Sequence, residues 1–262
     1  MARLLGLAAA FAAALVLPAA AFAGSLTLHP AGFGPHSYAA WKAQQGQPDS
    51  SGNGNHALYF QKDVPTTTIA AGTASVQGLA GEPATVLNGL SWEHRDDGHC
   101  GAGAPRWDIF VTSSTGMKET VFLGCAAAAH TPGSAPGWTR DSYDGLAIQT
   151  AISAVAGSNA TLRGLSIVFD EGNEAPMCSA DDPTNSCVRL DNIIVNDQCW
   201  TGPMDNGSGA PTAAQCTPAA FAPSLLPAVV PTDVIDSALM AQLADTFPDV
   251  APASWVFYTT PL

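Results

Sequence analysis

Six carboxylates gather in one short stretch, residues 167–196, which reads IVFDEGNEAPMCSADDPTNSCVRLDNIIVN. Proteins bind calcium through crowded carboxylate, amide and carbonyl oxygens. Asp170 and Asp191, at the ends of two expected strands, and the neighbouring Glu171 are therefore candidate calcium ligands. The residue order of an EF-hand is absent. This absence favours the competing interpretation, a solvated acidic loop that binds no cofactor and is closed by a bridge between Cys178 and Cys187.

Two histidines, His94 and His99, enclose Asp96 and Asp97 in the segment WEHRDDGHC. In the helical zinc motif, two histidines stand four residues apart, so that both imidazoles point at one ion. Here they stand five apart, and a strand is expected to end between them. We interpret them as loop histidines.

A glycoside hydrolase would need two carboxyls about 5 to 9.5 Å apart across a cleft. Candidates are Glu93, Asp97, Asp108, Asp170 and Glu171. The sequence brings no two of them together, and it contains neither a G-x-S-x-G nucleophile motif nor a phosphate-binding glycine motif. These observations favour a protein that is not an enzyme, with a hydrolase as the alternative.

Aromatic residues beside polar ones indicate a binding face, because sugar sites combine ring stacking with hydrogen bonds. Large aromatics are nevertheless buried on average. We therefore expect Trp92 and Trp107 in the core, and Trp138 exposed in the loop-like SAPGWTRDSYDG. The predicted ligand-binding residues are Trp138, Tyr143, Asp97 and Asp108.

The six cysteines are Cys100, Cys125, Cys178, Cys187, Cys199 and Cys216. An even number in an exported chain indicates disulfides, although six cysteines allow fifteen pairings. Proximity along the chain favours 100–125, 178–187 and 199–216. No two cysteines are close enough to form a zinc knuckle.

The first residues, MARLLGLAAAFAAALVLPAAAFAGS, have the layout of a secretory signal peptide over residues 1–23. The alternative is a retained membrane anchor, since the apolar run is nearly long enough to span a bilayer. Pro18 and the A-F-A cleavage pattern favour removal. We expect a secreted protein, extracellular or periplasmic, with no membrane attachment after cleavage.

The formal net charge is −13, and only 12% of residues are charged. Nucleic acid and anionic lipid both require clustered Lys and Arg, so neither is an expected partner. The counts of 25 glycines and 20 prolines indicate many turns between short strands. The oligomeric state stays open.

Short β-branched or aromatic runs separated by turn residues predict an all-β fold, an antiparallel β-sandwich, over residues 24–201. The runs are HALYFQK, ASVQGLAG, GLSWEHR, RWDIFVTS, ETVFLG, TLRGLSIVFD and RLDNIIVN. Because side chains alternate along a strand, Leu165, Ile167 and Phe169 should face the core.

The sequence changes in character after Trp200. Residues 202–231 are rich in Pro and Ala, as in a linker or an irregular strap. Residues 232–262 should contain one short helix, because Ile235, Leu239 and Leu243 lie on one stripe and Pro248 would end the helix.

The strand LDNIIVN, which follows SIVFDEG, resembles the closing strand of secreted bacterial β-sandwich modules of the jelly-roll type, among them carbohydrate-binding modules. The resemblance covers roughly Leu26–Trp200. It implies a non-catalytic binding module, with a polysaccharide or a cell-surface ligand as partner, in which Asp191 and Asn192 are structural or ion-linked. The alternatives are a secreted glycoside hydrolase with a carboxylate pair and a cell-surface structural or adhesion protein.

Overall fold

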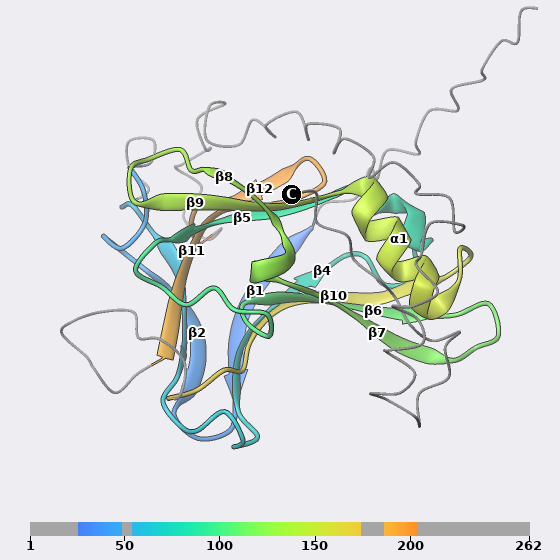
Figure 1. The fold of residues 1–262 in the computed structure, drawn as a ribbon, viewed down its shortest axis with the longest axis horizontal. Helices are drawn as coiled ribbons and strands as arrows, with labels where there is room; N and C mark the ends of the chain where they lie inside the picture. The colour runs from blue at the N-terminus through green and yellow to red at the C-terminus, as the bar shows by residue number, and fades with distance from the viewer. Residues whose placement is uncertain (1–25, 49–53, 174–185, 204–262) are drawn as a thin grey trace, which may run out of the picture.

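The computed structural model describes residues 26–48, 54–173 and 186–203, which form two β-sheets packed against each other (Figure 1). The five-stranded sheet has the order β1 (Thr27–Phe33), β4 (Ala71–Gln77), β10 (Thr161–Phe169), β6 (Arg106–Thr112) and β7 (Lys118–Gly124). The larger sheet has the order β2 (Ser37–Lys42), β3 (Ala57–Lys62), β11 (Ser186–Val195), β5 (Gly89–Arg95), β9 (Trp138–Asp144) and β8 (Ala129–Pro132), and β12 (Gln198–Trp200) pairs with β11. Every pairing is antiparallel. The predicted all-β sandwich is confirmed.

Alternation along β10 shows how the sequence determines which face is buried. Leu165, Ile167 and Phe169 belong to the hydrophobic core and are at most 1% exposed, as expected. Ser166 and Val168 point to the outer face of the sheet but are also buried. They are covered because β10 is the middle strand, between β4 and β6.

Two tryptophans join the sheets through the core. Trp92 from β5 and Trp107 from β6 are each 1% exposed, and their rings stack with centroids 5.1 Å apart. Each ring therefore buries its area against the opposite sheet. Their predicted core location is confirmed.

A disulfide closes the open end of the β6–β7 hairpin. Cys100, in the loop before β6, is bonded to Cys125, which follows β7 and begins the short 3-10 helix η2 (Cys125–Ala127). This pairing is the predicted one. Among the described residues no cysteine is free, and Cys187 and Cys199 are disulfide-bonded. Their partners lie outside the described residues, so the 178–187 and 199–216 pairings stay predictions.

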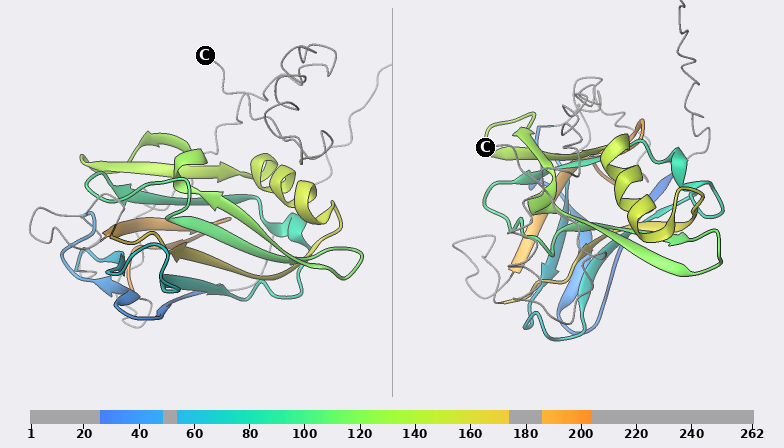
Figure 2. Two further views of the ribbon diagram at one scale, coloured as in Figure 1. Left: turned by 60° about the horizontal axis from the view of Figure 1, so that its bottom comes forward. Right: turned by 45° about the vertical axis from the view of Figure 1, so that its right-hand side comes forward.

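The strand patterns predict no helix before residue 201, yet α1 (Gly145–Ala156) lies at one end of the sandwich, in contact with β7 and β9 (Figures 1 and 2). Asp144 caps its start by accepting a hydrogen bond from the Ala147 amide at 2.8 Å. Ile148, Ile152 and Ala156, four residues apart, form its buried stripe. Both signals are present in the sequence. A second 3-10 helix, η1 (Ala84–Val86), precedes β5.

Three predicted segments lie outside the described residues: the signal peptide, the linker beyond Pro203 and the C-terminal helix. Within residues 26–48, 54–173 and 186–203, no helix combines the length and the hydropathy that a membrane span requires.

Candidate functional site

A row of side chains crosses all five strands on the outer face of the smaller sheet. The pairing registers place His29 beside Ser75, Ser75 beside Ser166, Ser166 beside Asp108 and Asp108 beside Phe122. These residues share one face because paired residues in a sheet point the same way. We call these five residues the central row. It places hydroxyl, imidazole and carboxylate groups next to an aromatic ring.

Two phenylalanines lie on the part of this face formed by β6 and β7: Phe122 ends the central row, and Phe110 lies beside the row on β6. The Phe122 side chain is 61% exposed, whereas Phe110 is half-buried. The Arg106 guanidinium carbon lies 5.2 Å from the Phe122 ring centroid, and that of Arg163 lies 5.8 Å from the Phe110 centroid. At these distances each guanidinium group is attracted to the neighbouring phenylalanine ring. The face therefore offers an open aromatic surface with charged and polar neighbours.

Asp108 is a buried carboxylate within this face. Arg106 Nε donates to Asp108 Oδ1 at 2.7 Å, and its two terminal nitrogens donate to the two carboxylate oxygens of Asp170 at 2.6 and 2.8 Å. Burial raises the pKa of Asp108, and this effect outweighs the opposing charge and hydrogen bond of Arg106. Burial also disfavours the charged Arg106, but the two carboxylates prevail and raise its pKa. Arg106 thus remains cationic and ties both acids together.

A depression of about 330 Å³ opens at the end of the face near Asp170. Its lining includes Phe33, Ile69 and Glu171, and the first two are 52% and 87% exposed. Lys62 forms part of its base: the side chain is buried, and Nζ donates to the backbone carbonyls of Thr66, Thr68 and Asp170 at 2.7–2.9 Å. The depression extends the face with apolar rims and an acidic wall.

The aromatic residues on the outer face of the larger sheet are less accessible. Tyr59 is only 7% exposed, and Lys42 Nζ lies 3.5 Å from its ring centroid. A ligand would have to displace that cation to stack on the ring. Among the described residues, the smaller sheet therefore presents the more open aromatic face.

The three predicted metal ligands have different partners. Asp170 pairs with Arg106, Glu171 contacts His99, and Asp191 Oδ2 accepts a hydrogen bond from the Gln47 amide at 2.7 Å. None of the three belongs to the metal-ligand group found within the described residues. The rest of the acidic loop, 174–185, lies outside those residues, so the calcium hypothesis stays a prediction.

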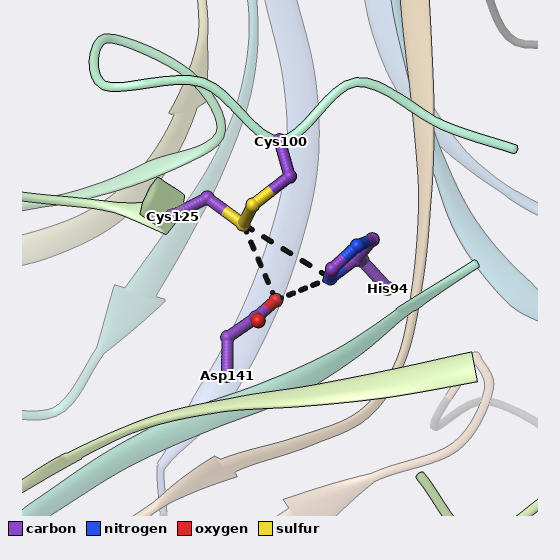
Figure 3. A group of neighbouring side chains, drawn as sticks. All are labelled: His94, Cys100, Cys125 and Asp141. Atoms are coloured by element: carbon purple, nitrogen blue, oxygen red, sulfur yellow. Dashed lines mark hydrogen bonds and ion pairs between the residues drawn. A yellow bond between two sulfur atoms is a disulfide. The ribbon is translucent and has the colours of Figure 1, made fainter. Parts of the chain in front are cut away.

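A polar group that the sequence did not indicate surrounds Asp141 on β9 (Figure 3). The carboxylate is 1% exposed and accepts from Trp92 Nε1 at 2.7 Å. The Nδ1 atoms of His94 and His130 lie 2.5 and 2.7 Å from its two oxygens. The sulfur of Cys125 lies 3.3 Å from Oδ2. This group contains His94 but not His99. The interpretation of the two as loop histidines is wrong for His94, which lies within β5 and is 8% exposed. His99 follows that strand, but it is 9% exposed and contacts Glu171.

No family model, curated protein or solved structure shows significant similarity to this chain.

The expected exposure of the aromatic candidates is wrong. Trp138 is 8% exposed because it begins β9 rather than lying in a loop, and the Gly133 amide donates to its carbonyl at 2.8 Å. Tyr143 packs in the core, with its hydroxyl donating to the Gly124 carbonyl at 2.6 Å. Neither ring can serve as an open stacking surface.

The two acidic residues predicted to bind a ligand, Asp108 and Asp97, lie on the sides of different sheets. Asp108 lies in the central row described above. Asp97 is on the larger sheet's side, where it pairs with Arg95. Burial would raise the pKa of Asp97, but the hydrogen bonds and charge of Arg95, with the charge of Arg189, lower it. Phe110 and Phe122 belong to the predicted strand runs RWDIFVTS and ETVFLG, and they are more accessible than Trp138.

Proposed function

We propose that this chain is a non-catalytic extracellular binding module for polysaccharide, and that the outer face of the five-stranded sheet holds the glycan. The observation that carries the proposal is the 61% exposed ring of Phe122 at one end of the polar central row. Sugar rings stack on aromatic faces through their C–H groups and hydrogen-bond through their hydroxyls. The signal-peptide pattern over residues 1–23 supports export.

The shape of the face suits an extended chain rather than a single small molecule. The central row spans the whole width of the sheet, from His29 on β1 to Phe122 on β7. Adjacent strands are about 4.8 Å apart, so five strands extend over roughly 19 Å, which is the length of several sugar residues. Of the polar members of the central row, His29 is exposed and Ser75 is half-buried, so their imidazole and hydroxyl groups can hydrogen-bond to a glycan. Ser166 and Asp108 are buried and support this face from beneath.

Replacing Phe122 with alanine should weaken retention on the bound polysaccharide by at least about tenfold, since truncation of an aromatic anchor costs about 2 kcal/mol or more. The measurement is affinity gel electrophoresis over a panel of soluble glycans, with pull-down on insoluble ones. Met117→Ala is the matched control, because Met117 is 60% exposed in the β6–β7 turn, away from the central row. Equal retention of both variants, or no retention of the parent protein on any glycan, would refute the proposal.

A secreted glycoside hydrolase is the second candidate. Asp108, whose pKa burial raises, stands beside the carboxylate of Asp170, and Arg106 bridges the two. A general acid with a raised pKa next to an ionised carboxylate is the arrangement that glycosidases use. Both acids are, however, already held by the same guanidinium. That pairing is better suited to a fixed binding surface than to proton transfer.

Asp108→Asn separates the two candidates. The folded-state pKa of Asp108 is raised, so its contribution to stability is fully present below the unfolded-state value and is lost as pH rises through the folded one. The asparagine variant should therefore melt no lower than the parent protein at pH 7, and it should lack this acid-side dependence. A binding module would lose glycan affinity, whereas a hydrolase would also lose release of reducing sugar. A large drop in the melting temperature at pH 7 would contradict the assigned burial effect.

A further inference from the structure

The group around Asp141 contains four side chains that can bind a transition metal. One ligand atom from each of His94, Cys100, Cys125 and Asp141 lies within 4.8 Å of every other (Figure 3). Four separate parts of the chain supply them: β5, the loop before β6, the start of η2, and β9. The sequence spacing gives no hint of this group, because the residues meet only when the two sheets pack.

Asp141 differs from Glu93 and Asp108, two other buried carboxylates, in how its charge is balanced. Glu93 pairs with Arg140, and Asp108 pairs with Arg106. The side-chain partners of Asp141 are one indole N–H, two imidazoles and a sulfur atom, with no lysine or arginine. A buried carboxylate is stable only when it is paired, hydrogen-bonded or bound to a metal. The indole N–H and the two imidazoles meet this requirement in the structure, and a metal ion bound to the same carboxylate would meet it as well.

The four ligand types match zinc. Zinc prefers tetrahedral coordination by thiolate, imidazole and carboxylate, with Zn–S near 2.3 Å and Zn–N or Zn–O near 2.0 to 2.2 Å. In such a site the two sulfurs stand about 3.8 Å apart, and the nitrogen and oxygen ligands about 3.4 Å apart. The disulfide bond therefore has to open, and the 2.5 Å hydrogen bond between His94 and Asp141 has to give way to the metal. The Cα atoms of the two cysteines are already 5.3 Å apart. Trp92 and His130 would remain on Asp141 as outer partners that fix the orientation of the carboxylate.

We propose that the reduced chain binds one Zn²⁺ through Cys100, Cys125, His94 and Asp141, and that the disulfide is the metal-free form of the same clamp. Zinc binding releases the two thiol protons. Oxidation by a disulfide-bearing oxidant transfers two electrons from the two thiolates to that disulfide, which takes up two protons and becomes two thiols. The S–S bond between Cys100 and Cys125 then forms, and Zn²⁺ leaves. In both states a covalent or coordinate link closes the β6–β7 hairpin.

The test titrates Zn²⁺ into the full chain in competition with a chromogenic chelator, before and after reduction by a phosphine under native conditions. The reduced protein should take up one Zn²⁺ per chain, and the oxidised protein none. Co²⁺ in its place should give the visible bands of a tetrahedral site and the charge-transfer absorption of two thiolates per metal. No uptake after reduction, or a Co²⁺ spectrum without thiolate absorption, overturns the proposal.

Variants assign the ligands. Loss of a residue that only orients a metal ligand weakens metal binding roughly 10- to 100-fold. His130→Gln should therefore weaken zinc binding by about tenfold, whereas the ligand variants His94→Gln and Asp141→Asn should each weaken it by more than roughly 100-fold. His29→Gln, on the exposed face of the other sheet, should leave zinc affinity unchanged, whatever its effect on glycan retention. The Cys100→Ser/Cys125→Ser chain keeps the remaining four cysteines, so zinc uptake by it would place the metal elsewhere and refute the assignment. Circular dichroism checks that each reduced variant is folded, and if one is not, the Co²⁺ spectrum of the unmodified chain decides.

Discussion

Replacing Arg140 with methionine is expected to lower the free energy of unfolding by about 3 to 5 kcal/mol, the usual effect of leaving one partner of a buried ion pair alone. Glu93 is fully buried, and Arg140 Nε and Nη2 donate to its Oε1 at 2.9 and 2.5 Å. Ser134 and Gln47 also donate hydrogen bonds to the Glu93 carboxylate, but both residues are uncharged. Urea denaturation at pH 7 measures the change.

An exposed ion pair provides the control for this prediction. Arg95 and Asp97 are 2.6 Å apart, but their side chains are 30% and 46% exposed. Arg95→Met should therefore cost less than about 1 kcal/mol. Equal losses in the two methionine variants would show that burial does not control the strength of the Glu93–Arg140 pair.

The stability that the Glu93–Arg140 pair adds should be lost in acid. Burial raises the pKa of Glu93, but the hydrogen bonds from Ser134 and Gln47 and the charge of Arg140 together lower it. In the parent protein, the stability contributed by ionised Glu93 is present above its unfolded-state pKa. It is lost as pH falls through its folded-state pKa. Without Arg140, one of the causes that lower the pKa of Glu93 is removed, so this pKa moves upward. The stability difference between the two proteins should therefore shrink in acid.

Trp107→Ala should lower the free energy of unfolding by about 3 to 5 kcal/mol, as large-to-small changes at buried aromatic positions do. The ring is 1% exposed and stacks on Trp92 of the opposite sheet. Loss of the Trp107 ring leaves a cavity between the two sheets. The cavity can close only if the backbones of neighbouring strands shift. Chemical denaturation, followed by the fluorescence of the remaining tryptophans, measures the effect.

Phe122→Ala is the comparison for this second prediction, since it also removes an aromatic ring from the five-stranded sheet. The ring is 61% exposed, so its removal should change stability by no more than about 0.5 kcal/mol. A loss as large as that of Trp107→Ala would mean that Phe122 is a structural residue, and it would weaken the case for a glycan surface.

The local patterns of the sequence predict the strands well, because alternation reports directly on which side of a sheet is buried. LRGLSIVF is an example: Leu165 and Ile167 are both in the core. The helix α1 was missed although Asp144 and the Ile148–Ile152 spacing indicate it. Its buried stripe contains only three residues, so its helical period is weak beside the strand runs on either side. The Cys100–Cys125 pairing was predictable because a hairpin brings the two ends of a short segment together.

The candidate sites could not be derived in the same way, because they depend on which strands become neighbours. Asp108 lies beside Ser166 only because β10 inserts next to β6. Asp141 meets Cys125 only after the sheets pack. Trp138 was expected to be exposed from its Gly- and Pro-containing surroundings, yet those residues form the turn that leads into β9. Composition indicates a loop, but it does not tell which side chains that loop covers.

The order in which strands enter the sheets has a consequence for how the chain folds. β10 lies between β4 and β6, and β11 lies between β3 and β5, so the middle of each sheet comes from residues near the end of the described chain (Figure 1). A nascent chain emerges with its amino terminus first, and the inner edges of β3, β4, β5 and β6 have no partners until residues 161–195 have been made. Such long-range pairing is slow, and unpaired edges invite intermolecular association. The domain should therefore fold only after residues up to Val195 have been synthesised, and any truncation before Val195 should yield an aggregating chain instead of a smaller stable core.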